Sequence, residues 1–134
     1  MVLVSVDSLP VTSSEHVVAV RQAVRHRAVE LGFSLVDQTK VVTAASELAR
    51  NTLMHGGGGA ARVETVSDGL RKGLRLTFED EGPGIADIPQ AMKDGFSTGG
   101  GLGLGLSGAK RLSHEFAITS APNQGTRIVI TRWK

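Results

Sequence analysis

Two polar side chains spaced one helical turn apart, Glu47 and Asn51, have the clearest chemical potential in this sequence. Apolar periodicity predicts a helix over about 37–54, and residues four apart lie on the same helix face. A carboxylate and an amide oxygen are hard ligands, suited to Mg²⁺ or to a hydroxyl group that is about to react. This face carries short Thr, Ser and Asn side chains, which suit a cleft. The pattern alone, however, favours an amphipathic helix with its polar side in water.

A second group of candidates is the sequence D-x-G-x-G, in which Asp80, Gly82 and Gly84 directly follow the strand expected at 73–79. An aspartate at the end of a buried strand is a hydrogen-bond acceptor that matches the exocyclic amine of adenine. Glycines without a Cβ let the backbone pass close to a flat base. Asp, Gly and Pro are also turn formers, so an ordinary turn is the alternative interpretation.

The third candidate is the glycine-rich run at 99–105, which leads into an expected helix. Backbone amides freed by glycine can bind phosphate oxygens, and a helix N-terminus adds partial positive charge. The run is neither a Walker A loop nor a Rossmann turn, and a flexible loop explains it equally well. A fourth candidate, Gly125-Thr126, opens the last expected strand, where a lone Thr is usually a strand former.

These candidates must be positioned by a small number of elements. Strand patterns occur at 2–7, 60–67, 73–79, 116–121 and 126–132, and helical patterns at about 13–31, 37–54, 88–93 and 105–114. Asp37 is expected to cap the second helix. The order predicts an α/β (α+β) two-layer sandwich with a mixed, mostly antiparallel sheet and helices on one face. A chain of 134 residues corresponds to one domain, 1–134.

Composition excludes several classes of function. The formal net charge is +2 without a dense basic run, so nucleic acid is not an expected partner. The chain has no cysteine, which excludes disulfides and thiolate metal sites. It lacks a signal peptide and any apolar run approaching about 18 residues, so no membrane is expected and the cytoplasm is the default location.

Taken together, the ordered motifs resemble the Bergerat ATP-binding fold of gyrase, the Hsp90 chaperone, histidine kinases and MutL-type repair proteins. The resemblance covers about 10–134. The segments SELARN, EDEGPGI and DGFSTGGGLGLGLSGAKRL further resemble bacterial serine/threonine protein kinases of partner-switching pathways. They are more similar to the stressosome switch kinase than to the anti-sigma-factor kinases, which usually carry a longer lid.

The resemblance implies roles for individual residues with ATP and Mg²⁺ as cofactors. Asn51 would hold Mg²⁺, and Glu47 would be the general base or would position the substrate hydroxyl. Asp80 would accept a hydrogen bond from the adenine amine, and Thr126 would reach adenine through a water molecule. The remaining cofactor-binding positions would be Gly82, Gly84, Gly101, Leu102, Gly103, Leu104 and Gly105. A lid at 97–101 would close over ATP.

Four further residues and one glycine run have less definite roles. Lys110 could approach the phosphates, although the simpler interpretation is that it is a solvent-exposed lysine on the helix. His55 could lie near the lid or cap the helix end, and the run at 56–59 has no assigned role. His16 and His26 are expected to be surface residues.

The resemblance also implies partners. The substrate would be a serine or threonine of an antagonist protein of the STAS class, and release of the kinase would activate a PP2C-type phosphatase. An anti-sigma output, in which a sigma factor is bound, is the alternative. A nucleotide-gated binding module with little catalysis is a second functional hypothesis, against which the presence of Glu47 argues. The partner's identity, its phosphorylated residue and the oligomeric state do not follow from the sequence.

Overall fold

The computed structural model describes residues 2–93 and 105–134. The elements follow one another in the order β1 (Val2–Val11), α1 (Ser14–Leu31), α2 (Leu35–Met54), β2 (Gly59–Ser67), β3 (Lys72–Asp80), α3 (Ile88–Ala91), α4 (Gly105–Arg111), β4 (Glu115–Ser120) and β5 (Thr126–Trp133). Each expected helix and strand is present, with some different bounds. Within the described part of the chain, no helix is both long and apolar enough to cross a bilayer.

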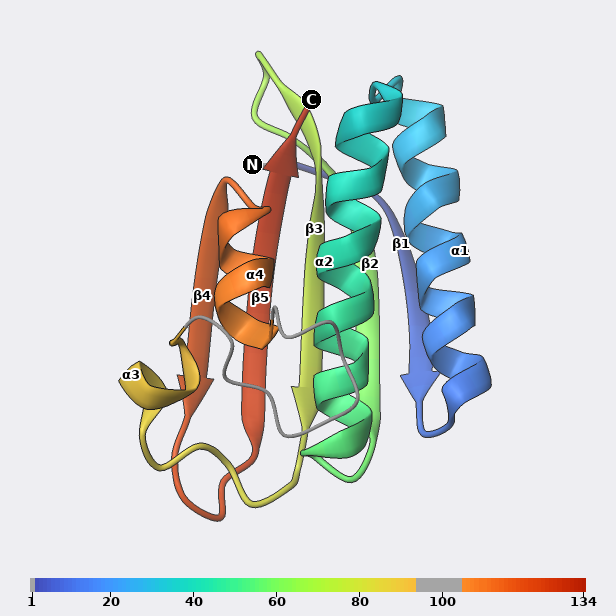
Figure 1. Cartoon of the computed structure of the whole chain (residues 1–134). Helices are drawn as coiled ribbons and strands as arrows, with labels where there is room; N and C mark the ends of the chain where they lie inside the picture. The colour runs from blue at the N-terminus through green and yellow to red at the C-terminus, as the bar shows by residue number, and fades with distance from the viewer. Residues whose placement is uncertain (1, 94–104) are drawn as a thin grey trace.

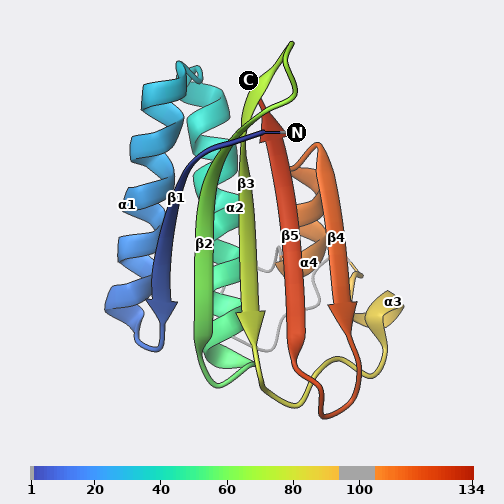
Figure 2. The same ribbon diagram turned by 180° about the vertical axis from the view of Figure 1, so that it is seen from behind.

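The strands form one sheet with the order β1-β2-β3-β5-β4. All four pairings of the described strands are antiparallel, so the parallel pairing allowed for by the sequence is not found among them. Helices α1, α2 and α4 pack on one face of the sheet (Figure 1). The opposite face carries no helix of the described residues (Figure 2). The two-layer α+β class predicted from the element order is confirmed.

The core lies between the sheet and the helices because strand side chains alternate between the two faces. Val63, Leu76 and Ile130 are register partners across β2, β3 and β5 and are fully buried. From the helical layer, Val20 of α1 and Leu48 of α2 belong to the same cluster and are 0% exposed. The apolar spacing of these helices thus holds α2, which carries Glu47 and Asn51, against the sheet.

The start of α2 differs from the sequence prediction. Ser34, and not Asp37, is the N-cap, since its side chain accepts from the Asp37 backbone N–H at 3.1 Å. The Asp37 carboxylate instead accepts a hydrogen bond from Nη2 of Arg132 on β5 at 2.8 Å. Arg132 is 95 residues away in the sequence and therefore gave no local signal. The pair joins the start of α2 to the end of β5.

Strand β1 is also longer than predicted and continues through Pro10 to Val11, which pairs with Gly59. Proline usually interrupts a strand because it has no N–H to donate. Here β1 is an edge strand of the sheet, where a missing donor is tolerated. The position of the strand in the sheet, which local sequence does not reveal, explains the difference.

An ion pair links β1 to α1 and makes the stability of the protein pH-dependent. Nε and Nη2 of Arg27 donate to the Asp7 carboxylate at 2.8 and 3.2 Å, and these hydrogen bonds hold the pKa of Asp7 below its ordinary value. A carboxylate with a depressed pKa contributes stability above its unfolded pKa, and the contribution is lost as pH falls through the folded pKa. Asp7→Asn should therefore lower the free energy of unfolding by about 0.5–1 kcal/mol at pH 7.

Urea unfolding between pH 7 and pH 3 measures this effect. The difference between wild type and Asp7→Asn should shrink towards the acid end. Asp7→Asn combined with Arg27→Gln should cost little more than Arg27→Gln alone, because loss of the guanidinium already removes the pair with Asp7 as well as the contact with Glu30. A difference that stays constant with pH would contradict the assignment.

Candidate active site

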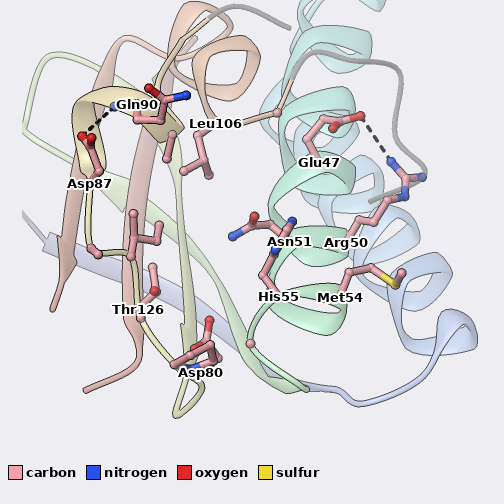
Figure 3. A pocket seen from close by; sticks show the side chains of 17 residues that line it. Glu47, Arg50, Asn51, Met54, His55, Asp80, Asp87, Gln90, Leu106 and Thr126 are labelled. Atoms are coloured by element: carbon pink, nitrogen blue, oxygen red, sulfur yellow. Dashed lines mark hydrogen bonds and ion pairs between the residues drawn. The ribbon is translucent and has the colours of Figure 1, made fainter. Parts of the chain in front are cut away.

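A cavity of about 290 Å³ lies at the C-terminal half of α2. Its wall is formed by α2, the end of β3, the segment 83–87, α3 and the starts of α4 and β5. Figure 3 shows these elements converging on one space, with Asp80 and Thr126 at one end and Glu47 further along α2. Residues of all four sequence motifs thus meet in one site, the glycine-rich run being represented by Gly105.

The polar face of α2 is the first wall of this cavity. Glu47 and Asn51 both line it, and Glu47 is only 7% exposed. The cleft interpretation is therefore confirmed for the part of this helix face at Glu47 and Asn51, whereas Thr43 and Ser46 are not among the lining residues. In Figure 3 the Asn51 amide projects from α2 on the side of Thr126 and Leu106, while the Glu47 carboxylate is turned towards Arg50.

Arg50 is a site residue to which the sequence gave no role. Its Nη1 donates to Oε1 of Glu47 at 3.2 Å, and it also lines the cavity. The pair holds a nearly buried carboxylate in one orientation with a compensating positive charge. The three-residue spacing of Glu47 and Arg50 on a helix was the available signal, because residues i and i+3 are neighbours on the helix surface.

The second wall is formed where β3 ends and β5 begins. Asp80 and Thr126 are register partners on these two strands, and both line the cavity. Oδ1 of Asp80 accepts from the backbone N–H of Gly82 at 2.9 Å, and Thr126 is 7% exposed. Strand pairing therefore places a carboxylate and a hydroxyl side by side at one end of the cavity.

Close contacts explain the first glycine after α2, Gly56. A Cβ on Gly56 would lie 2.2 Å from Cγ of Asp80, and a Cβ on Gly82 would lie 2.7 Å from Cα of Gly56. Any side chain at Gly56 would push Asp80 out of its position. The first residue of the run at 56–59 is thus required by the packing of the D-x-G-x-G segment, and Gly82 itself is not among the residues that line the cavity.

The D-x-G-x-G segment is held against the turn between β4 and β5. Gly84 has φ +75° and lines the cavity, and a Cβ there would lie 2.0 Å from the carbonyl oxygen of Ala121. The Gly125 N–H donates to the Gly82 carbonyl at 3.1 Å, and the Asn123 N–H donates to the Pro83 carbonyl at 2.7 Å. Two turns that are distant in the sequence therefore form one rigid end wall.

Ser120 completes this wall and was missed by the sequence analysis. Its Oγ accepts from the backbone N–H of Ile85 at 2.8 Å. It also lies 2.9 Å from Oγ1 of Thr126. A single serine in a strand of alternating pattern carries no local signal of such a role.

The glycine-rich motif is described only at its end. Gly105 is the first residue of α4 and lines the cavity together with Leu106. The other predicted positions, Gly101, Leu102, Gly103 and Leu104, lie outside the described residues, as does the lid expected at 97–101.

Lys110, on α4, is exposed and lies outside the cavity lining, as expected of a solvated lysine. His55 is the C-cap of α2, and it also lines the cavity. It thus occupies the capping position and borders the site at the same time. His26 is exposed, with its ring 3.7 Å from Glu30, and the His16 ring accepts from the Thr12 N–H at 3.0 Å.

Comparison with known proteins identifies the family to which the chain belongs. Residues 36–134 match the family described as histidine kinase-, DNA gyrase B-, and HSP90-like ATPase. The chain is 51% identical to the serine/threonine-protein kinase RsbT of Bacillus subtilis (strain 168), over 87% of this chain and 88% of that relative. It is 30% identical to an anti-sigma F factor of Bacillus licheniformis, over 77% of this chain and 74% of the relative.

Among solved structures, the chain resembles the RsbU and RsbW domains of a Mycobacterium tuberculosis protein with a TM-score of 0.65 and 20% identity. That match covers 98% of this chain and 33% of the other. At this identity the structural likeness establishes the fold alone. The family match over most of the chain and the high identity to a curated kinase establish that the chain belongs to the histidine kinase-, DNA gyrase B- and HSP90-like ATPase family.

Proposed function

We propose that this chain is an ATP-dependent serine/threonine protein kinase that phosphorylates a STAS-domain antagonist protein in a partner-switching pathway. The observation that carries the proposal is the single cavity that brings Glu47, Asn51, Asp80 and Thr126 together. The chain is also 51% identical to a serine/threonine-protein kinase along nearly its whole length.

ATP would lie along the cavity with its base at the end formed by β3 and β5. Asp80 and Thr126 supply hydrogen-bonding oxygen atoms there, and Gly84 keeps the wall thin enough for a flat ring. The phosphates would lie towards Glu47, Asn51 and the start of α4 at Gly105. The adenine and phosphate roles inferred from the motifs thus agree with one orientation of the nucleotide.

The donor set fits Mg²⁺. This ion usually keeps several waters and takes only one or two protein ligands in addition to phosphate oxygens. The Asn51 amide oxygen can supply that protein ligand, since Asn51 lines the cavity one helical turn from Glu47. When bound, the ion would neutralise charge that develops on the phosphates during transfer.

Glu47 would accept the proton of the substrate hydroxyl. The serine or threonine oxygen forms a bond to the γ-phosphorus, the bond from that phosphorus to the bridging oxygen of ADP breaks, and the hydroxyl proton passes to Glu47. The Arg50 guanidinium, 3.2 Å away, would hold the carboxylate in the orientation in which it can receive this proton. Burial of Glu47 keeps water from competing for it.

The resemblance to partner-switching kinases supports the choice of protein partners. A STAS-domain protein would be the substrate, and a PP2C-type phosphatase would be the partner bound after release. Dependence on ATP suits action in the cytoplasm, where the nucleotide is supplied.

Incubation of the purified chain with γ-labelled Mg-ATP and each STAS-domain protein of its source organism tests the proposal. Label on a serine or threonine of one of these proteins is the expected result. ATP binding without transfer to any of them would favour a nucleotide-gated binding module. Failure to bind ATP at all would overturn the nucleotide site itself.

A further inference from the structure

We infer that Ser120 determines the direction of the Thr126 hydroxyl and thereby makes the base end of the cavity selective for a nucleobase with an amino group over one with a carbonyl at the same position. This inference rests on the proposed function, because it assumes that Asp80 and Thr126 face the base. It adds a specificity-determining residue that lies behind the cavity wall.

Three groups surround the Ser120 hydroxyl at hydrogen-bonding distance. The Ile85 backbone N–H points to Oγ at 2.8 Å, the Gly125 carbonyl oxygen lies 2.9 Å away, and Oγ1 of Thr126 also lies 2.9 Å away. The first group can only donate and the second can only accept. Thr126 is the one partner of the three that could either donate or accept the hydrogen bond.

The count of hydrogens decides the role of Thr126. A serine hydroxyl has one hydrogen to give and two lone pairs to receive. If its hydrogen goes to the Gly125 carbonyl, it can accept from Ile85 and must also accept from Thr126. This is the arrangement in which all three contacts are hydrogen bonds, and it directs the Thr126 hydrogen towards Ser120.

A hydroxyl whose hydrogen is engaged can only accept additional hydrogen bonds. Thr126 is 7% exposed and lines the cavity, so the lone pairs of its oxygen are the capacity that it offers to a ligand or to a water bound there. Its register partner Asp80 presents a carboxylate, whose Oδ1 accepts from the Gly82 N–H at 2.9 Å. Both side chains at this end of the cavity are therefore acceptors.

An end wall made of acceptors matches a donor. The 6-amino group of adenine supplies hydrogen atoms, directly or through water, whereas the 6-carbonyl of hypoxanthine supplies none. A buried carbonyl opposite acceptors would leave polar groups unpaired, which costs more than a missing hydrogen bond. Inosine nucleotides, which differ from adenosine nucleotides at this edge of the base, are therefore the appropriate probes.

The test compares the dissociation constants of ADP and IDP by calorimetry, because diphosphates avoid turnover. Wild type should bind ADP more tightly than IDP. Ser120→Ala removes the acceptor of the Thr126 hydrogen, which can then turn to the base and serve the inosine carbonyl. The dissociation constant of IDP divided by that of ADP should therefore fall by about 3- to 10-fold, which corresponds to the free energy of one neutral hydrogen bond. Ser120→Thr, which keeps the hydroxyl, should restore the wild-type ratio.

A purely structural role of Ser120 would give a different result. If Ser120→Ala only disordered the wall, the binding of ADP and of IDP would weaken by the same factor. The ratio of their dissociation constants would then stay unchanged, which would overturn the inference. Thr126→Val, which is nearly isosteric, should lower the ratio by itself, and adding Ser120→Ala to it should change the ratio no further. This variant keeps the inference testable if Ser120→Ala fails to fold.

The remaining outcomes separate this inference from the proposed function. Wild type that binds ADP and IDP equally would contradict the acceptor wall while leaving the kinase intact. Wild type that binds neither would overturn the nucleotide site and the inference with it.

Discussion

Replacing Glu47 by Gln should reduce the rate of phosphate transfer about 10²- to 10⁴-fold, which is the usual contribution of a positioned general base. Glutamine has nearly the same shape but cannot take up the proton of the substrate hydroxyl. The side chain is 7% exposed and lies in the cavity next to Arg50, so the change should leave the pocket in place. The dissociation constant for ATP should therefore change by only a few fold.

Single-turnover transfer to the STAS-domain substrate, with ATP binding measured separately, tests this expectation. Glu30→Gln is a matched control, because it makes the same chemical change on α1 at a half-exposed residue. The control should transfer phosphate at the wild-type rate. A Glu47→Gln protein with an unchanged single-turnover rate would remove Glu47 from the chemistry and leave it a structural partner of Arg50.

Replacing Asp80 by Asn should weaken nucleotide binding about 10- to 100-fold. Hydrogen bonds to charged groups are worth about 1.5–3 kcal/mol, and about 1.4 kcal/mol corresponds to a factor of ten in affinity. An amide can turn its nitrogen towards the adenine amine and so place two donors face to face. It can also weaken the hydrogen bond from the Gly82 N–H to Oδ1, which shapes the turn at this end of the cavity.

Calorimetric titration with ADP measures the affinity, and transfer at saturating ATP separates binding from chemistry. The loss should appear in the dissociation constant and in KM, with kcat largely recovered at high ATP. Asp68→Asn, in the exposed turn between β2 and β3, is the matched control and should bind ADP like wild type. An Asp80→Asn protein with unchanged affinity would show that the base does not lie at this end of the cavity.

The residues proposed for the site were predictable to the extent that their signals are local. Glu47 and Asn51 lie one helical turn apart, and the apolar periodicity of α2 determines which face is buried against the sheet. Asp80, Gly82 and Gly84 follow a strand of clear alternation, and Thr126 follows a turn that ends in glycine. Such patterns depend on residues within a few positions of one another.

The roles of the supporting residues depend on contacts across the fold. Ser120 meets Ile85, which is 35 residues away, and Asp37 meets Arg132, which is 95 residues away. The need for glycine at Gly56 arises from the Asp80 side chain on another element. None of these partners can be identified from local spacing, because strand order and packing decide which distant residues become neighbours.

The sequence by itself therefore determined the class of fold and the helix face that lines the cavity, and it singled out Glu47, Asn51, Asp80 and Thr126, which all line that cavity. These features follow from helical and strand periodicity and from turn chemistry. Only the tertiary structure decided the antiparallel pairing of the described strands, the extension of β1 past Pro10, the Arg50–Glu47 pair in the cavity and the hydrogen-bond network at Ser120. The physical reason is that hydrogen-bond direction and close packing are set by partners that the fold brings together from distant parts of the chain.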